Sequence, residues 1–191
     1  MAVFSTMLEL GTPLPAFDLP DTVGGERVSS TSLVGSVSVV AILCNHCPYV
    51  KHIQRELAAF GSACAARGVK MVAISSNDVV SHPEDGPAQM AQEARRAGYT
   101  FPYLYDEDQS VAKKFRAACT PELYVFDSTG KLAYRGRFDE STPRTGSKVT
   151  GADARAAVDA LLSGNAPTTD QKPSIGCSIK WKDGNAPDYT R

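Results

Sequence analysis

Two cysteines separated by two residues, Cys44 and Cys47, are the residues of this sequence best suited to chemistry. They follow the apolar run 39–43 and precede apolar residues at helical spacing, positions 53, 57, 60 and 63. A CxxC pair at such a strand-to-helix junction is typical of a thiol-disulfide redox centre. The first turn of a helix has unpaired N–H groups and a partial positive charge, which stabilise a thiolate. We therefore expect Cys44 to be the nucleophile and Cys47 to resolve the mixed disulfide.

His46 lies between the two cysteines, and its imidazolium form would lower the pKa of a neighbouring thiol further. A structural zinc site would need a second CxxC or a histidine pair at zinc-finger spacing. The other thiols and histidines stand alone, at Cys64, Cys119, Cys177, His52 and His82. The sequence has no phosphate-binding or dinucleotide-binding glycine motif. We therefore predict redox chemistry without a bound metal or an organic cofactor.

Composition excludes several other function classes. The chain has 191 residues, 42% of them hydrophobic, which suits one domain with a modest extension. A net charge of -1 gives no electrostatic reason to expect a nucleic-acid or membrane partner. Residues 1–9 lack the pattern of a signal peptide, and no apolar run is long enough to span a bilayer. We expect a cytoplasmic protein, unless a leader has been removed, with reduced or catalytic cysteines.

The elements that must position the pair follow a β-α-β order. The Val-rich segment 37–43 predicts a strand, and the helix that opens at Cys47-Pro48 should end near Gly68. Residues 69–75 predict a second buried strand, parallel to the first across a right-handed connection. Ahead of this unit, turn residues between two short extended runs predict a hairpin within residues 14–29.

The second half of the chain predicts more elements of the same α/β fold. A polar loop at 77–87 should border the site, although we interpret its His82 as a solvated loop histidine rather than an acid or base. Helices are expected near 88–97 and 109–115, with a strand at 101–105 between them. Strands at 122–126 and 131–136 should form an antiparallel hairpin. The predicted architecture is a central mixed β-sheet flanked by helices.

Two further cysteines lie where they could take part in redox exchange. Cys119 comes two residues before Pro121 and should lie near the CxxC pair, although it could equally be a small buried apolar residue. Cys177 belongs to the extension at 166–191, which follows a domain at 1–165 and has apolar residues that could dock it. Either thiol could relay the disulfide. Cys64 fits best as a core residue of the first helix.

The element order, the CxxC at the first βα junction and the Thr120-Pro121 pair resemble the thioredoxin superfamily, and more closely its AhpC/TSA or redoxin branch. The resemblance covers about residues 10–165. The string Cys44-Asn45-His46-Cys47-Pro48 and the closing segment 173–182 are similar to a bacterial subgroup of AhpC/TSA-type thioredoxin-like proteins. The resemblance implies a thioredoxin-like fold, a cis Pro121 that faces the disulfide, and a Thr120 backbone presented to a bound thiol substrate.

Departures from better-known relatives restrict the function that the resemblance implies. Leu43 replaces the Trp of thioredoxin, and the preceding strand lacks its buried carboxylate, so proton handling must differ. The peroxiredoxin pattern Pro-x-x-x-Thr/Ser-x-x-Cys is incomplete for both cysteines. Its Pro and hydroxyl positions are occupied by Val37 and Ala41 when aligned on Cys44, and by Val40 and Cys44 when aligned on Cys47.

We therefore predict a thiol-disulfide oxidoreductase that uses a Cys44-x-x-Cys47 couple. Its partners would be protein or small-molecule thiols and disulfides and a thioredoxin- or glutathione-type reductant. The residues expected to shape the site are His46, Thr120 and Pro121, with Cys119 and Cys177 as additional candidate redox thiols. Because the CxHC pair resembles oxidising disulfide catalysts, we expect a reduction potential above the roughly -270 mV of thioredoxin.

Two alternatives remain open. The first is a peroxiredoxin-like thiol peroxidase of the AhpC/TSA type. The second is a copper chaperone similar to the Sco proteins, because two thiolates suit Cu(I). The CxxC spacing argues against the second alternative, since the Sco group has CxxxC.

Overall fold

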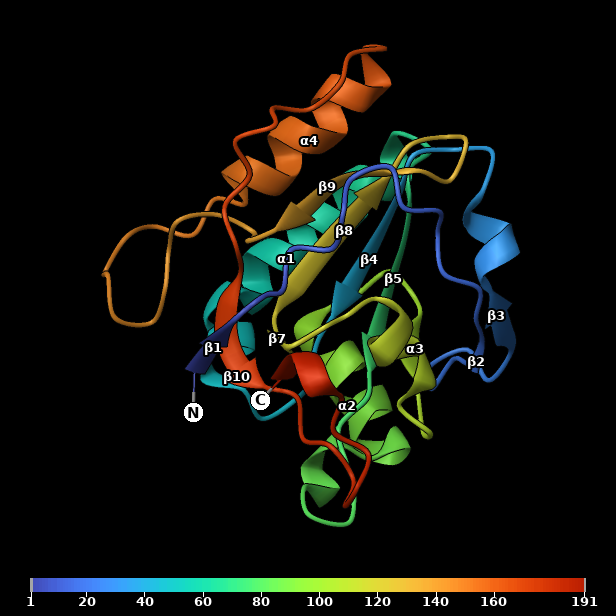
Figure 1. The fold of residues 1–191 in the computed structure, drawn as a ribbon, viewed down its shortest axis with the longest axis vertical. Coiled ribbons are helices and arrows are strands. Elements are labelled where there is room, and N and C mark those ends of the chain that lie inside the picture. The colour runs from blue at the N-terminus through green and yellow to red at the C-terminus, as the bar shows by residue number, and fades with distance from the viewer. Residues whose placement is uncertain (1, 191) are drawn as a thin grey trace.

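The chain folds around a five-stranded sheet. A computed structural model describes residues 2–190, so the outer ends of the two predicted units, Met1 and Arg191, lie outside the described residues. The strand order is β6-β5-β4-β8-β9 (Figure 1). The bounds are Ser38–Ile42 for β4, Lys70–Ser75 for β5, Tyr103–Tyr105 for β6, Glu122–Phe126 for β8 and Leu132–Gly136 for β9. β5 is parallel to β4 and β6, whereas β8 is antiparallel to β4 and β9, which confirms the expected mixed sheet.

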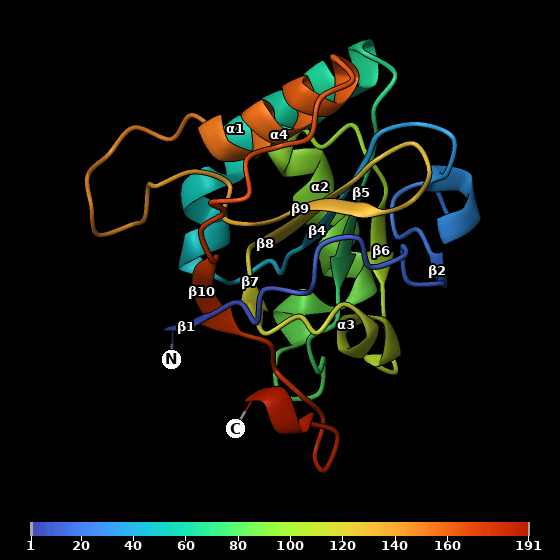
Figure 2. The same ribbon diagram turned by 45° about the horizontal axis from the view of Figure 1, so that its top comes forward.

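Helices cover both faces of this sheet, which is why β4 and β8 are buried along their whole length. Alternate residues of β4 face opposite sides, as the period of a strand requires. Val39 and Ala41 lie in the core cluster that includes residues of three helices, whereas Val40 and Ile42 lie in the cluster on the other face. The helices of the first face are α1 (Pro48–Ala66), α2 (Pro87–Ala97) and α4 (Ala152–Leu162), and α3 (Ser110–Lys114) lies on the second (Figure 2).

Helix α1 begins and ends where the sequence predicts. Its first residue is Pro48, whose fixed φ and missing N–H suit the first helical position. Cys47 is therefore the N-cap residue. Gly68 follows the end of the helix with a φ of +73°, a left-handed conformation that glycine adopts without steric cost.

A second, three-stranded sheet brings both ends of the chain to β7. Its antiparallel order is β1-β10-β7, with bounds Ala2–Phe4, Ile175–Ser178 and Cys119–Thr120 (Figure 2). Cys177 pairs with Thr120, and Ser178 pairs with Cys119. The predicted extension thus contributes a strand between two strands of the predicted domain, and the boundary at residue 165 stays a prediction.

The predicted N-terminal hairpin is present, as β2 (Asp18–Pro20) paired antiparallel with β3 (Arg27–Ser29). Short 3-10 helices complete the fold at Ser30–Leu33, Pro83–Asp85 and Asp188–Thr190. Among the described residues, the model contains no helix with both the length and the apolar character needed to cross a bilayer.

Candidate active site

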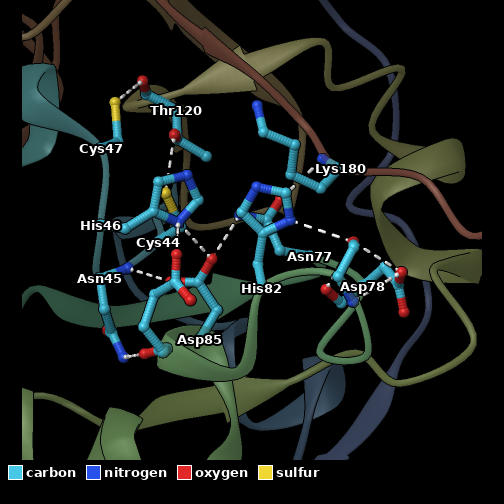
Figure 3. Close-up of polar contacts among 12 residues, drawn as sticks. Cys44, Asn45, His46, Cys47, Asn77, Asp78, His82, Asp85, Thr120 and Lys180 are labelled. Atoms are coloured by element: carbon cyan, nitrogen blue, oxygen red, sulfur yellow. Dashed lines mark hydrogen bonds and ion pairs between the residues drawn. The ribbon is translucent and has the colours of Figure 1, made fainter.

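The two cysteines of the CxxC motif meet Thr120 of β7. The Cys44 Sγ lies 3.2 Å from the Thr120 hydroxyl, and the Cys47 thiol donates to the Thr120 carbonyl oxygen, also at 3.2 Å (Figure 3). The Thr120–Pro121 peptide bond is cis, as the resemblance implies. Both thiols are buried, with exposures of 1% for Cys44 and 0% for Cys47. The fold therefore brings both halves of the predicted site together.

The loop before α2 contributes Asp85, a residue that the sequence analysis missed. Its buried carboxylate accepts hydrogen bonds from the Asn45 backbone N–H, the His46 Nδ1 and the Asn77 side-chain amide, each at 2.7 Å (Figure 3). The signal available in the sequence is an acidic residue in a Pro- and Gly-punctuated loop expected to border the site. Asp85 holds the segment between the two cysteines in place and orients the His46 ring.

His82, which the sequence analysis interprets as a solvated loop histidine, lies in the loop but is half-buried and stacks against His46. The two imidazole rings stack with centroids 4.8 Å apart, and Ser81 Oγ lies 3.0 Å from His82 Nδ1. The stacking arises because the 3-10 turn at Pro83–Asp85 returns the loop to the cysteine segment. Two imidazoles therefore lie together beside the thiol pair.

The two thiols differ strongly in acidity. The pKa of Cys47 is lowered to about 4, chiefly by a hydrogen bond from the Cys44 thiol, and also by Cys177, Thr120 and the Val50 N–H, against the effect of burial. The same hydrogen bond raises the pKa of Cys44, which burial and the negative charge of Asp85 raise further. We expected the helix end to serve Cys44; α1 starts at Pro48, so its N-cap residue is Cys47, which lies nearer than Cys44 to the positive end of the helix.

Cys177 lies beside the pair, whereas Cys119 faces away from it. Cys177 packs against the core cluster that contains Cys44 and Cys47, and its thiol helps to lower the pKa of Cys47. Cys119 is fully buried, with its Sγ 3.9 Å from a Glu122 carboxylate oxygen, and burial raises its pKa well above the usual value. This environment fits the interpretation of Cys119 as a small buried residue.

Glu122 is a second buried carboxyl that the sequence analysis did not single out. It pairs with Ile42 across β4 and β8, and burial raises its pKa to about 7. Its oxygens accept from the Tyr124 hydroxyl at 2.6 Å and the Ala118 N–H at 3.1 Å. A charged residue at the start of an otherwise apolar strand was the available signal. Glu122 therefore lies beside Cys119, on the face away from the redox pair.

The C-terminal segment is hydrogen-bonded to the same network. The Lys180 N–H donates to the Asn77 side-chain oxygen at 2.8 Å, and the amide of Asn77 donates to Asp85 (Figure 3). The Asp78 N–H in turn donates to the Lys180 carbonyl. A chain of hydrogen bonds therefore runs from the tail through Asn77 and Asp85 to His46.

Some of these side chains are close enough to share a metal ion. One ligand atom each of Cys44, His46 and Asp85 lies within 4.8 Å of the others, and the same holds for His46, His82 and Glu84. A thiolate with an imidazole and a carboxylate is a ligand set that divalent transition metals accept.

A separate cavity of about 260 Å³ opens beside Pro121, lined in part by Phe4, Tyr49 and Ile175.

The fold and the paired thiols define a protein with thioredoxin-like architecture, which confirms the fold predicted from the sequence. Residues 10–135 match the AhpC/TSA family, and the chain belongs to that family. The predicted resemblance to this branch is thereby confirmed.

Solved structures extend the likeness over the whole chain. An uncharacterized conserved protein from Geobacillus kaustophilus is 48% identical, with 97% of this chain and 98% of that chain covered and a TM-score of 0.94. A hypothetical protein from Sinorhizobium meliloti 1021 is 44% identical, with 95% and 99% covered and a TM-score of 0.92. A thiol:disulfide interchange protein from Chlorobium tepidum TLS shares the fold at 19% identity, with 81% and 99% covered and a TM-score of 0.62. No curated protein matches the chain.

Proposed function

We propose that this protein is a thiol-disulfide oxidoreductase whose redox couple is Cys44 and Cys47. The observation that carries the proposal is the contact of both CxxC thiols with Thr120, beside the cis Pro121 and at the N-terminus of α1. Membership of the AhpC/TSA family supports cysteine-based redox chemistry. The Chlorobium neighbour, whose name describes disulfide interchange, supports the same class of reaction.

The lowered pKa of Cys47 makes it the attacking thiolate at neutral pH. Cys47 attacks one sulfur of a substrate disulfide, and the other substrate sulfur leaves as a thiolate. Cys44 then loses its proton and attacks the Cys47 sulfur, which releases the second substrate thiol and leaves a Cys44–Cys47 disulfide. His46, which lies within 4.8 Å of Cys44 and is oriented by Asp85, is placed to take that proton. The reverse sequence oxidises a dithiol.

The partners follow from this reaction. Protein or small-molecule thiols and disulfides would be the substrates, and the cavity beside Pro121 offers an apolar wall to a substrate side chain. We place the reaction in the cytoplasm, where a thioredoxin- or glutathione-type reductant would supply electrons. The proposed chemistry requires neither an organic cofactor nor a metal.

A glutathione redox titration of the purified protein tests the proposal. We expect one reversible two-electron couple, with peptide mapping that identifies Cys44 and Cys47 as the disulfide. Cys44→Ser and Cys47→Ser should each abolish the Cys44–Cys47 disulfide, whereas Cys64→Ala, a change in the core of α1, should leave it in place. A protein whose CxxC thiols stay reduced in every glutathione mixture would contradict the proposal.

Thiol peroxidase activity is the second candidate, because Cys47 is the N-cap residue of α1 and its pKa is lowered to about 4, as an activated thiolate requires. Val40 and Cys44 occupy the Pro and hydroxyl positions of the peroxiredoxin pattern, which favours the disulfide reaction. Hydrogen peroxide consumption in the same preparation decides between them. Fast turnover that depends on Cys47 and persists in Cys44→Ser would favour the peroxidase.

Copper binding is the third candidate, because Cys44, His46 and Asp85 bring their ligand atoms within 4.8 Å. Cu(I) prefers thiolate ligands, and Cys47 could add a second sulfur. Metal analysis after purification under reducing conditions, and titration with Cu(I), test it. Stoichiometric copper that is lost in His46→Ala would support a metal-binding role over the disulfide reaction.

A further inference from the structure

The buried position of the CxxC pair raises the question of how an external thiol reaches it. Cys44 is 1% exposed and Cys47 is 0% exposed, so neither sulfur meets solvent directly. Disulfide exchange requires an attacking thiolate to contact the sulfur under attack. Cys177 is the neighbouring thiol that is only partly buried. A route through Cys177 would connect the buried pair to the surface.

The pairing of β10 with β7 directs the Cys177 side chain toward the pair. Directly opposed residues of an antiparallel ladder present their side chains on the same face, and successive residues alternate between faces. Cys177 is opposite Thr120, whose side chain contacts Cys44, whereas Ser178 is opposite Cys119. Cys177 therefore shares the face of the redox pair. Cys119, one residue before Thr120, lies on the opposite face beside Glu122.

The backbone around Gly176 brings this strand close to β7. A Cβ at Gly176 would overlap the Thr120 carbonyl, so the approach requires glycine. Strand β10 also packs against α1, the helix that Cys47 caps (Figure 2). The Cys177 thiol is near enough to Cys47 to lower the pKa of the Cys47 thiol. Three sulfurs therefore lie in sequence, from Cys44 through Cys47 to Cys177.

We propose that Cys177 is a third redox thiol, which exchanges with the Cys44–Cys47 disulfide and carries it to the surface as a Cys47–Cys177 disulfide. This inference rests on the proposed oxidoreductase function. The Cys177 thiolate attacks the Cys47 sulfur, the Cys47–Cys177 bond forms, and the Cys44–Cys47 bond breaks. Cys44 leaves as a thiolate and takes up the proton that Cys177 gave up. No net oxidation occurs in this step.

An external thiol then completes the exchange at Cys177. Its thiolate attacks the Cys177 sulfur and forms a mixed disulfide there, and Cys47 leaves as a thiolate. A second external thiol attacks the mixed disulfide and releases Cys177 as a thiol, so that two thiols are oxidised and one protein disulfide is reduced. A thiol of lower pKa leaves faster. The pKa of Cys47 is lowered to about 4, whereas burial raises that of Cys177 to about 11, so attack at Cys177 has the better leaving group.

Disulfide mapping in a Cys44→Ser variant treated with oxidised glutathione tests the relay. We expect glutathione to form a mixed disulfide at the partly exposed Cys177 and Cys47 to displace it, so that a peptide pair joining Cys47 and Cys177 accumulates. In Cys44→Ser/Cys177→Ser the buried Cys47 should take up glutathione far more slowly, and no second thiol should displace it. Adding Ser178→Cys to that double variant moves the thiol by one residue to the opposite face and should not restore a disulfide to Cys47. A stable glutathione adduct in Cys44→Ser itself would overturn the proposal.

Reduction kinetics provide a second test that does not depend on the Cys44→Ser variant. We expect reduced glutathione to open the disulfide of a Cys177→Ser variant at least about tenfold more slowly than that of the wild type, because the partly exposed Cys177 thiol is missing. Cys64→Ala should react at the wild-type rate. Equal rates for wild type and Cys177→Ser would overturn the relay alone, since the Cys44–Cys47 couple would still form. Loss of that couple in the wild type would overturn the proposed function as well.

Discussion

At the scale of single residues, the site depends on one buried carboxylate. Asp85 has no exposed surface, and its two oxygens accept from three donors on two segments: the Asn45 N–H and the His46 ring of the CxxC turn, and the Asn77 side chain. A buried carboxylate is tolerated when such charge-assisted hydrogen bonds satisfy it. Its charge also raises the pKa of Cys44. Asp85 therefore both holds the turn and biases the proton toward Cys44.

Replacing Asp85 with Asn should destabilise the protein and make Cys44 more acidic. An amide nitrogen cannot accept, so at least one buried donor loses its partner, at a cost of about 1–3 kcal/mol in the free energy of unfolding. Urea unfolding measures the first effect, and titration of thiolate absorbance measures the second. Glu84→Gln is the matched control. Glu84 lies near the same ring, with its carboxylate 3.6 Å from the His46 Nδ1, but its side chain is 48% exposed. An Asp85→Asn variant as stable as the control would contradict this assignment.

Glu122 should make the stability depend on pH. Burial raises its pKa from 4.5 to about 7, so the folded state holds the proton more tightly than the unfolded state. The contribution of Glu122 to the free energy of unfolding should therefore be greatest below pH 4.5 and be lost as the pH rises to about 7, a change of roughly 3 kcal/mol at about 1.4 kcal/mol per unit. Denaturant unfolding across this range measures the slope, which Glu122→Gln should remove. Equal slopes in the two proteins would contradict the prediction.

At the scale of elements, α1 positions the site through its contact with the sheet. Its N-cap is Cys47, and its buried side lies in the core cluster with alternate residues of β4 and β5. Near the middle of the helix, Gly61 allows close contact with the Phe101 ring, which a Cβ would overlap. The distance of the helix from the sheet, and hence the placement of Cys47, depends on this glycine.

Gly61→Ala should destabilise the fold although alanine favours helices. The gain in helix propensity is about 1 kcal/mol, whereas forcing a methyl group into a packed core costs about 1–3 kcal/mol, so we expect a small net loss. Phe101→Leu should recover part of it in the double variant, since it removes ring atoms at the point of overlap. Thermal and urea unfolding of the three variants give the answer. A Gly61→Ala protein more stable than the wild type would show that Phe101 moves aside freely.

At the scale of the whole molecule, both ends of the chain return to the redox site. β1 and β10 add to β7, and the tail beyond β10 reaches the Asp85 network through Lys180 and Asn77. Oxidation or reduction of the cysteines therefore changes contacts that join both ends of the chain to the central sheet. We expect the free energy of unfolding to differ between the oxidised and the reduced protein.

We expect the reduced protein to be more stable than the oxidised protein. The Cys47 thiolate, with its pKa lowered to about 4, is stabilised in the folded reduced state, which raises the reduction potential above the roughly -270 mV of thioredoxin. Each 30 mV corresponds to about 1.4 kcal/mol. Urea unfolding of both forms, together with the glutathione titration, measures the two quantities independently. A potential at or below that of thioredoxin, with the oxidised form the more stable, would contradict the expectation.

The sequence by itself determined the βαβ unit, the hairpins and the position of the CxxC motif between a strand and a helix. Apolar periodicity, a proline in the first helical turn and Gly-containing turns act on neighbouring residues, so they can be recognised without the rest of the fold. The buried strand at β4 and the bounds of α1 follow from these local preferences.

Only the tertiary structure decided which residues surround the thiols. Asp85 reaches Asn45 from a distant loop, His82 stacks on His46, and β10 places Cys177 opposite Thr120. The acidity of Cys47 rather than Cys44 also depends on these contacts and on the residue at which α1 starts. Hydrogen bonds and charges in the site join segments far apart in the chain, and their partners are fixed by packing, which local sequence preferences do not encode.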